Sequence, residues 1–248
     1  MTLDIIEESK RLEDSGAGEI LDWTFEHFDA SKVKMSTSFG ADGMALLHMM
    51  HSRGHRPKIF TIDTGRLFQE TYNVWQKVID QYGVKIEVYG PDPADLHELV
   101  ESGGPNMFYQ SVENRRKCCE IRKVRPLNKA LQDTDVWITA LRRDQAPSRA
   151  TTPILSHSSQ YDLLKVCPLV NWSEVNAWEY IRNNGIPYNE LHDKGYPTIG
   201  CSPCCRPVPP ASDRRAGRWW WESGDDKECG IHIEDGKIVR KKKANFVI

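Results

Sequence analysis

Four cysteines in two close pairs stand in cationic surroundings. Cys118 and Cys119 are adjacent within the segment 115–123, which holds five cationic side chains and one acidic side chain. Cys201 and Cys204 form a Cys-x-x-Cys pair further along the chain. Nearby cations favour the thiolate, which is the form of cysteine that binds metal. Four thiolates suit an iron–sulfur cluster or a structural zinc ion, so the two pairs predict a metal centre of one of these kinds.

A structural zinc ion is the simpler centre, but the adjacent pair fits it poorly. Zinc sites with four sulfur ligands normally use spaced Cys-x-x-Cys pairs, because each pair has to wrap around the ion. Adjacent side chains on a helix point about 100° apart, so Cys118 and Cys119 do not both face one compact centre from a relaxed helix. We therefore expect a distorted helix or a turn at this pair.

Cys229 is another candidate for chemistry and has a different neighbourhood. Glu228 and Gly230 flank it, His232 follows three positions later, and no other cysteine lies within 20 residues. One interpretation is an exposed thiol near the end of the chain. The other is a nucleophile on a flexible segment that closes over a bound substrate. The residues alone leave both interpretations open.

The segments that would position a ligand are strands followed by polar turns. Residues 33–38 read as a strand that runs into the Ser- and Gly-containing turn 36–41, and a helix resumes at Met44. Such a unit offers backbone N–H groups and a helix N-terminus to an anion, although no Gly-Lys-Ser/Thr of a Walker loop follows. A phosphate site and an ordinary turn are both compatible with these residues.

A second predicted strand, residues 58–62, is followed by Asp63, Thr64 and Gly65. In open α/β sheets, ligands gather outside the carboxyl ends of the strands. A carboxylate at such a place either meets a ribose or amide group of a ligand or caps the next helix. The sequence does not decide between these two roles.

Three arginines follow a later predicted strand, residues 136–140. Arg142, Arg143 and Arg149 suit planar, bidentate recognition of phosphate or sulfate oxygens. The alternative is a solvated loop in which arginine pairs with aspartate.

The other elements are read from periodicity and from helix-breaking residues. Helical patterns cover 4–29 with a break at 16–18, 68–82, 94–117 with a turn at 103–105, 126–131 and 174–183, and strand patterns cover 85–89 and 161–166. Tyr72 and Trp75 share one helix face with Ile79, and we interpret these aromatic residues as core rather than as part of a cofactor site. We interpret Cys167 as a core residue.

Length, composition and charge restrict the classes of protein to which this chain can belong. The 248 residues suffice for one large domain or two small ones, and apolar and charged shares of 39% and 27% are typical of soluble globular proteins. A net charge of −2 gives no bulk field that would recruit nucleic acid or a membrane, and no apolar run approaches membrane-spanning length. The first residues lack the pattern of a signal peptide, and an odd count of seven cysteines argues against a disulfide scaffold. We therefore expect a cytoplasmic protein with neither nucleic acid nor membrane as a partner.

Three motifs together resemble the assimilatory adenylylsulfate (APS) reductases. The two cysteine pairs, separated by 81 residues, are similar to the cluster-binding pattern of that family. The Glu-Cys-Gly-Ile-His segment 228–232 looks like its catalytic tail, and the Arg-Arg-Ala-Gly-Arg-Trp-Trp-Trp-Glu segment 214–222 matches the sequence upstream of that tail. The resemblance covers roughly residues 31 to 232.

The resemblance implies a single α/β domain with a mostly parallel twisted sheet, of the adenine nucleotide alpha hydrolase-like kind, and a mobile C-terminal arm. Residues 1–206 would form the domain that binds a sulfonucleotide and holds the iron–sulfur site, and residues 207–248 would form the arm that carries the nucleophile. A small hairpin at 231–239, with Asp-Gly at its turn, departs from the family pattern.

The activity that the resemblance implies is thioredoxin-dependent reduction of adenosine 5′-phosphosulfate to sulfite and AMP, through a cysteine S-sulfonate. The implied cofactor is a [4Fe–4S] cluster on Cys118, Cys119, Cys201 and Cys204. The implied catalytic residues are Cys229, Lys123 and His232. The implied substrate-binding residues are Ser36, Ser38, Phe39, Gly40, Asp63, Thr64, Gly65, Arg142, Arg149, Arg215 and Arg218.

Two other activities remain as alternatives. A 3′-phosphoadenylylsulfate reductase, or an enzyme of dual specificity, performs the same chemistry on a substrate with one more phosphate, although relatives specific for that substrate generally lack the two cysteine pairs. An ATP-pyrophosphatase-type ligase is more distant, because its loop is richer in glycine and serine than residues 36–41. The sequence does not decide between thioredoxin and glutaredoxin, or between a monomer and a homo-oligomer. Cys205 departs from the family pattern, and it is either an alternative ligand or a residue without a role.

Overall fold

A six-stranded sheet with the strand order β4-β3-β2-β5-β7-β6 forms the centre of the structure. The computed structural model describes residues 2–210, 212–222 and 245–247. Five strands are parallel to one another, and β6 runs antiparallel to β7 at one edge. The strands are β2 (Val33–Ser36), β3 (Lys58–Ile62), β4 (Ile86–Tyr89), β5 (Val136–Ile138), β6 (Leu155–Ser158) and β7 (Leu163–Val166). The predicted α/β fold with a mostly parallel sheet is confirmed.

Burial on both faces explains why such short segments form the central strands. Every residue of β5 and of β7 is buried. Strands that are covered on both faces read as continuous apolar runs rather than as alternating patterns. Val136-Trp137-Ile138 is such an apolar run. Lys165 is the charged residue of the neighbouring strand β7, and its ammonium group lies 5.4 Å from the ring centroid of Trp137.

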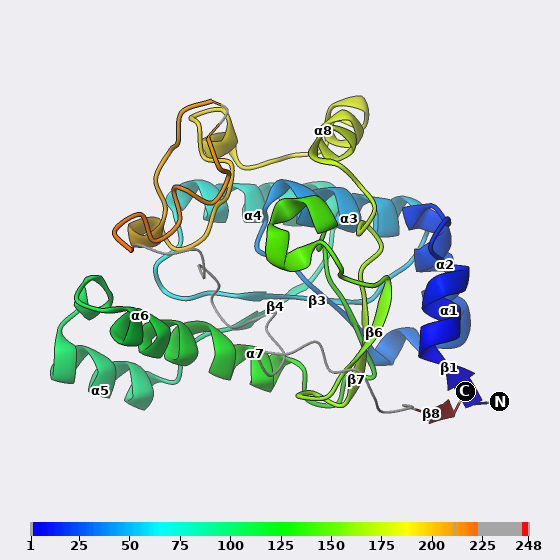
Figure 1. The fold of residues 1–248 in the computed structure, drawn as a ribbon, viewed down its shortest axis with the longest axis horizontal. Helices are drawn as coiled ribbons and strands as arrows, with labels where there is room; N and C mark the ends of the chain where they lie inside the picture. The colour runs from blue at the N-terminus through cyan, green and yellow to red at the C-terminus, as the bar shows by residue number, and fades with distance from the viewer. Residues whose placement is uncertain (1, 211, 223–244, 248) are drawn as a thin grey trace.

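Helices cover both faces of the sheet, as Figure 1 shows. On one face lie α3 (Ala41–Ser52), α4 (Gln69–Tyr82) and α8 (Glu174–Asn183). On the opposite face lie α5 (Pro93–Gly103), α6 (Val112–Cys119) and α7 (Arg125–Ala130). Near the β6 edge lie α1 (Ile5–Arg11) and α2 (Ala17–His27). In the described part of the chain, no helix is long and apolar enough to cross a bilayer.

Short elements complete the fold. A separate two-stranded sheet pairs β1 (Thr2–Asp4) antiparallel with β8 (Asn245–Val247), so the two ends of the described chain lie together (Figure 1). Single 3₁₀ turns span Ala30–Lys32, Met107–Tyr109, Arg143–Gln145, Pro147–Arg149, Glu190–His192 and Ser202–Cys204.

The order of the strands determines where a ligand crevice forms. From β2 the chain first adds β3 and β4 on one side, and it adds β5 later on the other side. The connections that leave the carboxyl ends of β2 and β5 therefore diverge, and such a switch point is where open α/β sheets bind ligands. The turn after β2 and the segment after β5 are the two predicted anion-binding segments, so the topology brings them together.

The expected distortion lies directly after the adjacent cysteine pair, because Cys118 and Cys119 themselves form the regular end of helix α6. Helix α6 ends at Cys119 and continues as a π-helical turn, Glu120–Val124, before α7 begins at Arg125. A π-helical turn accommodates an extra residue and often occurs at functional sites. It changes the direction of the side chains that follow Cys119, Lys123 among them.

Two details differ from the sequence analysis. No strand is predicted at residues 155–158, because Leu-Ser-His-Ser has a single apolar residue; the segment is an edge strand whose partner is β7. The face of α4 that carries Tyr72 and Trp75 is not buried along its whole length, because Ile79 on that face is 36% exposed, whereas Val74 and Val78 are buried.

Candidate active site

A cleft of about 320 Å³ opens at the carboxyl ends of β2, β3 and β5. Its walls come from the turns after these strands and from two late segments, 197–201 and 214–218. The predicted site residues that line it are Ser36, Ser38, Gly40, Thr64, Lys123, Arg142, Arg149, Cys201, Arg215 and Arg218. Segments that are far apart in the sequence therefore meet at the switch point of the sheet.

The turn after β2 presents small residues and a helix N-terminus to the cleft. The backbone N–H of Thr37 donates to the carbonyl of Phe60 at 2.9 Å, which ties the turn to the neighbouring strand. Helix α3 begins directly after Gly40, and its first residues, 41–43, line the cleft. An anion bound here would meet the positive end of the helix dipole.

Phe39 belongs to the same turn, but it is not among the residues that line the cleft. Its side chain is fully buried and stacks on Trp75, with the ring centroids 5.3 Å apart. Its φ of 57° lies in the left-handed region, where a non-glycine residue is strained by about 1–3 kcal/mol and persists only when the surroundings enforce it. In this structure Phe39 shapes the turn, and Ser36, Ser38 and Gly40 face the cleft.

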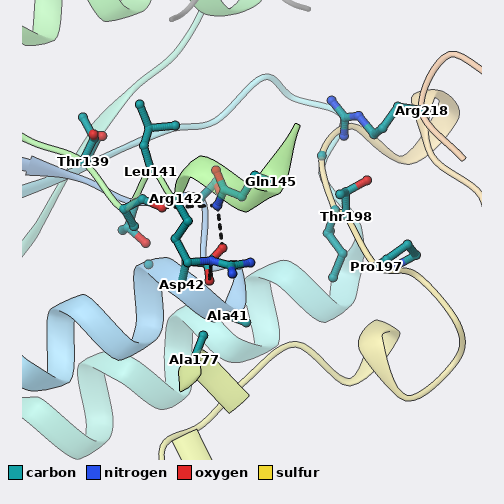
Figure 2. Close-up of a pocket in the computed structure, with 18 of the residues that line it drawn as sticks. Ala41, Asp42, Thr139, Leu141, Arg142, Gln145, Ala177, Pro197, Thr198 and Arg218 are labelled. Carbon is teal, nitrogen blue, oxygen red and sulfur yellow. Dashed lines mark hydrogen bonds and ion pairs between the residues drawn. The ribbon is translucent and has the colours of Figure 1, made fainter. Parts of the chain in front are cut away.

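One wall of the cleft holds a set of balanced charges (Figure 2). Arg142 is buried, and its guanidinium pairs with Asp42 at 2.8 Å and with Asp144 at 2.6 Å. Gln145 donates to the second carboxylate oxygen of Asp42 at 2.7 Å and accepts from Arg149 at 2.5 Å. Arg142 therefore combines features of the two arrangements that the sequence leaves open: it lines the cleft, and it is paired with aspartate.

The turn after β3 connects the cleft to the cysteines. The Asp63 carboxylate accepts from the backbone N–H of Gly65 at 2.8 Å and from the hydroxyl of Tyr72 at 2.9 Å, so it stabilises the turn itself. Thr64 lines the cleft, and its hydroxyl lies 3.3 Å from the Sγ of Cys201. Asp63 and Gly65 are not among the described residues that line the cleft.

The four predicted metal ligands come together in one site. Cys119, Cys201 and Cys204 share a buried cluster with Phe108 and Trp219, and Cys118 packs against it. A small cavity at this site is lined by Arg66, Phe108, Arg115, Cys118, Cys119, Arg122, Lys123, Cys201, Pro203 and Cys204. We call this place the cysteine site.

Hydrogen bonds and cations favour a thiolate at Cys201. Its pKa lies well below the ordinary thiol value, first because the S–H group of Cys204 donates to its sulfur, and then through Lys123 and the hydroxyl of Thr64. The pKa of Cys204 is raised, because it is the donor in that hydrogen bond and because it is buried. Burial also raises the pKa of Cys118. The protein itself thus stabilises negative charge on the sulfur of Cys201, and it favours the neutral thiol at Cys118 and Cys204.

Hydrogen-bond donors around the cysteines suit an anionic, sulfur-ligated group. Nε1 of Trp219, Nε1 of Trp221 and Nε of Arg122 are buried and find no acceptor among the described residues. Trp219 and Trp221 pack in the cysteine site, and Arg122 lines its cavity. Among the residues that the structure describes, no three Cys, His, Asp or Glu side chains form a group that could hold a metal ion. The four thiols would therefore have to turn toward a common centre to bind one.

A buried ion pair attaches the segment 212–222 to the cysteine site. Arg115 of α6 is fully buried, and its Nε and Nη2 donate to the two carboxylate oxygens of Glu222 at 2.9 and 2.8 Å. The same guanidinium lies 4.3 Å from the ring centroid of Trp219. The backbone N–H of Trp219 donates to the carbonyl of Cys204 at 3.1 Å. The late segment is thus bound both to α6 and to the Cys-x-x-Cys turn.

Lys123 and Cys201 line both the cleft and the cavity of the cysteine site. Lys123 is buried in the π-helical turn, so its ammonium group is part of the wall between them. Arg215 and Arg218 come from the late segment, and Figure 2 shows Arg218 near Thr198, on the side away from Arg142. The cleft is therefore cationic on the side next to the cysteines.

Two predicted catalytic residues, Cys229 and His232, lie outside the described residues, as does the predicted hairpin at 231–239. Three residues of the site were missed by the sequence analysis. Asp42 directly follows the turn 36–41, and Arg214 is the first residue of the motif 214–222, so these positions were the available signal. Glu222 has its partner 107 residues earlier, so no local pattern indicates the pair.

The doubly wound sheet with a ligand cleft at its switch point defines the adenine nucleotide alpha hydrolase-like class of α/β proteins, as predicted. Residues 32–207 match the phosphoadenosine phosphosulfate reductase domain family, and the chain belongs to this family. The family expected from the cysteine pattern, and with it the class of oxidoreductase, is confirmed.

Curated relatives and solved structures agree with this assignment. The chain is 45% identical to adenosine 5′-phosphosulfate reductase from Burkholderia cepacia over 82% of its length and 81% of that protein. It is 41% identical to the Allochromatium vinosum protein of the same name, over 88% of this chain and 85% of that one. The structure of a phosphoadenylyl-sulfate reductase from Candida auris, in a phosphate complex, superposes with a TM-score of 0.71 at 26% identity and covers 82% of this chain and 96% of that one. An FMN adenylyltransferase from Candida glabrata shares the fold alone. It is 14% identical and superposes with a TM-score of 0.57 over 88% of this chain and 74% of that one.

We expect Glu222→Ala to destabilise the protein strongly. The variant leaves the Arg115 guanidinium buried without its carboxylate, a change that costs about 3–5 kcal/mol. Chemical unfolding in urea measures the difference. Asp95→Ala is the matched control, since it removes a carboxylate from Arg125 in an ion pair whose side chains are 50% and 33% exposed, where the loss is about 0–1 kcal/mol. Equal losses in the two variants would contradict the assigned role of the buried pair.

Proposed function

We propose that the protein reduces adenosine 5′-phosphosulfate to sulfite and AMP, with thioredoxin as reductant, in assimilatory sulfate reduction. The observation that carries the proposal is the common wall of two sites. A cationic cleft at the switch point and a site of four cysteines share Lys123 and Cys201. Relatives that are 45% and 41% identical bear the name of this activity, and their matched regions include most of both chains.

The cleft suits a nucleotide with anionic oxygens. Its volume of about 320 Å³ lies at the lower end of the range for small-molecule sites. Lys123, Arg149, Arg215 and Arg218 line it, and arginine forks match the oxygens of phosphate and sulfate. The turn after β2 and the first turn of α3 would receive the phosphate. We further propose that Asp63, Thr64 and Gly65 hold the adenosine. Thr64 lines the cleft, and Asp63 and Gly65 act by shaping the turn.

Cys118, Cys119, Cys201 and Cys204 are the proposed ligands of a [4Fe–4S] cluster. Their sulfur atoms, the surrounding cations and the unpaired indole N–H groups together fit such a group better than they fit zinc. When bound, the cluster supplies local electrostatic stabilisation and holds its ligand segments in place. Lys123, which lines both cavities, is proposed to act on the charge of the substrate.

The proposed chemistry has two stages at Cys229. Its thiolate attacks the sulfur of the substrate, an S–S bond forms, the bond from sulfur to the phosphate oxygen breaks, and AMP leaves. A thiolate of thioredoxin then attacks the Sγ of Cys229 and displaces sulfite. The second thiol of thioredoxin resolves this mixed disulfide, so the thioredoxin dithiol supplies the two electrons. His232 belongs to the same proposed catalytic segment.

The anchor at Glu222 ties residues 212–222 of the proposed arm, residues 207–248, to the proposed domain of residues 1–206, so the tether for the nucleophile starts at Glu222. Seven residues lead from Glu222 to Cys229, and an extended chain of that length reaches at most about 25 Å. Glu222 is bound to Arg115 beside the cysteine site, whose cavity shares a wall with the cleft. A nucleophile on this tether is therefore within reach of the cleft.

We also propose that the protein works in the cytoplasm, because reactive and metal-binding free thiols suit a reducing compartment.

A 3′-phosphoadenylylsulfate reductase is the second candidate, because the solved structure reported above carries that name. Comparing kcat/KM for the two nucleotides decides between them, and dual use would appear as similar values. No protein reported above bears the name of a ligase, and the FMN adenylyltransferase shares the fold alone.

The function is tested by giving anaerobically purified protein adenosine 5′-phosphosulfate, with and without thioredoxin. With thioredoxin, sulfite and AMP should form, and glutaredoxin can be compared in the same assay. Without it, one cysteine should gain about 80 Da, the mass of the transferred SO₃ group in covalent catalysis. Peptide mapping should place the adduct on Cys229, and thioredoxin should remove it.

Cys229→Ser is the matched variant. It should still bind the nucleotide but release no AMP, because a serine hydroxyl is a far poorer nucleophile than a thiolate at neutral pH. Turnover by this variant, or an adduct on Cys205 or Cys167 of the wild-type protein, would overturn the mechanism.

We expect Cys118→Ser to lose bound iron and visible absorbance, because it removes one of four ligands. Iron analysis and absorbance of anaerobically prepared protein measure both. Cys167→Ser is the control: this thiol is buried in the core, where it is paired with the hydroxyl of Thr139, whereas Cys118 is partly buried in the cysteine site. Stoichiometric zinc without iron in the wild-type protein would refute the cluster.

We expect Lys123→Ala to lower kcat/KM by about 10²-fold or more, the scale for losing a group that stabilises developing charge. Steady-state kinetics measure the loss, and thermal unfolding should show that the variant stays folded. Lys117→Ala removes an exposed lysine of the same basic segment and should behave like the wild type. A folded Lys123→Ala enzyme with full activity would exclude this role.

A further inference from the structure

We propose that Cys205 is a positioning residue for Arg218, and that their contact sets the affinity of the cleft for the phosphate oxygens that the substrate shares with AMP. This inference rests on the proposed function, because it concerns the same cleft.

Cys205 is separate from the cysteine site, although it directly follows Cys204. It is buried, yet it belongs neither to the cluster of the four cysteines nor to the described residues that line the two cavities. Its Sγ accepts a hydrogen bond from Nη1 of Arg218 at 2.9 Å. Its backbone is extended, with φ −133° and ψ 143°, and an extended residue projects its side chain away from that of its neighbour.

The backbone keeps the two partners in register. Cys205 and Arg218 face each other in an antiparallel bridge. On one side of the bridge, the N–H of Arg206 donates to the carbonyl of Gly217 at 3.1 Å, and on the other side the N–H of Trp219 donates to the carbonyl of Cys204 at 3.1 Å. The contact between the thiol and the guanidinium is therefore part of a fixed pairing of two segments.

Two further contacts confine the Arg218 side chain. A Cβ at position 200 would collide with its guanidinium, so any residue other than glycine there would displace the end of the Arg218 side chain. The ring centroid of Trp219 lies 5.0 Å from the guanidinium carbon. Arginine has many rotamers, and the freedom that it loses on binding a ligand weakens the complex. A side chain that the protein already holds in place loses less, and Arg218 lines the cleft in this held position (Figure 2).

The three roles open to Cys205 differ in measurable ways. A fifth ligand would change the iron content when it is replaced, and a residue without a role would change nothing. A positioning residue changes the binding of nucleotide and leaves the iron in place.

The test compares Cys205→Ala, Cys205→Ser, Arg218→Ala and the double variant Cys205→Ala/Arg218→Ala, each as the iron-loaded full chain. AMP affinity is measured by calorimetry and KM and kcat by turnover of adenosine 5′-phosphosulfate. Cys205→Ala should keep its iron, weaken AMP binding and raise KM by about five- to tenfold, the scale of one net hydrogen bond, and change kcat less. Cys205→Ser should recover most of the affinity, because its hydroxyl also accepts. Ser202→Ala, an exposed position in the same turn, should bind like the wild type.

The decisive comparison uses the Arg218→Ala background. If Cys205 acts through Arg218, replacing it there should have no further effect on AMP affinity. Additive effects, loss of iron from Cys205→Ala, or wild-type affinity in that variant would each overturn the inference while the proposed function stands. A wild-type protein that binds no AMP and forms no sulfite would overturn both.

Discussion

The buried ion pair between Arg115 and Glu222 holds the parts of the site in one arrangement. A buried charge that loses its partner is strongly unfavourable, so the two side chains require each other. The chain between the Cys-x-x-Cys turn and Glu222 includes Arg215 and Arg218 of the cleft wall. The position of that wall therefore depends on a contact between residues that lie 107 positions apart.

The basic segment 115–123 is not a uniform patch of charge. Arg115 points inward to Glu222, Arg122 donates to the backbone carbonyl of Thr64 at 2.6 Å, and Lys123 lines both cavities. Arg116 and Lys117, which follow Arg115 in the sequence, are exposed. The π-helical turn after α6 produces this division, because it redirects the side chains after the cysteine pair. Cations that are neighbours in the sequence thus have separate roles: Arg115 stabilises the fold, Arg122 binds the turn after β3, and Lys123 lines the cleft.

Local patterns predicted most of the fold, and the limits of the prediction have physical reasons. Apolar runs identified the buried strands, and polar residues at their ends pointed to the correct edge of the sheet. Strand β6 was missed because an edge strand needs little apolar surface and is defined by its partner. The pairing of Arg115 with Glu222 depends on the three-dimensional path of the chain, which no local spacing records. The resemblance placed Phe39 with the ligand, and its burial in the structure could not be read from the sequence, because one buried residue inside a polar turn leaves no periodic signal.

Phe39 restricts how this turn can vary during evolution. Its left-handed backbone favours glycine or asparagine, whereas its buried stack with Trp75 favours a flat aromatic ring. Glycine would relieve the backbone and leave a void beside Trp75, and any other aromatic residue would retain the strain. Each single replacement satisfies one requirement at the expense of the other. Drift at this position would therefore need a concerted change at residue 75, so the two sites should covary rather than diverge independently.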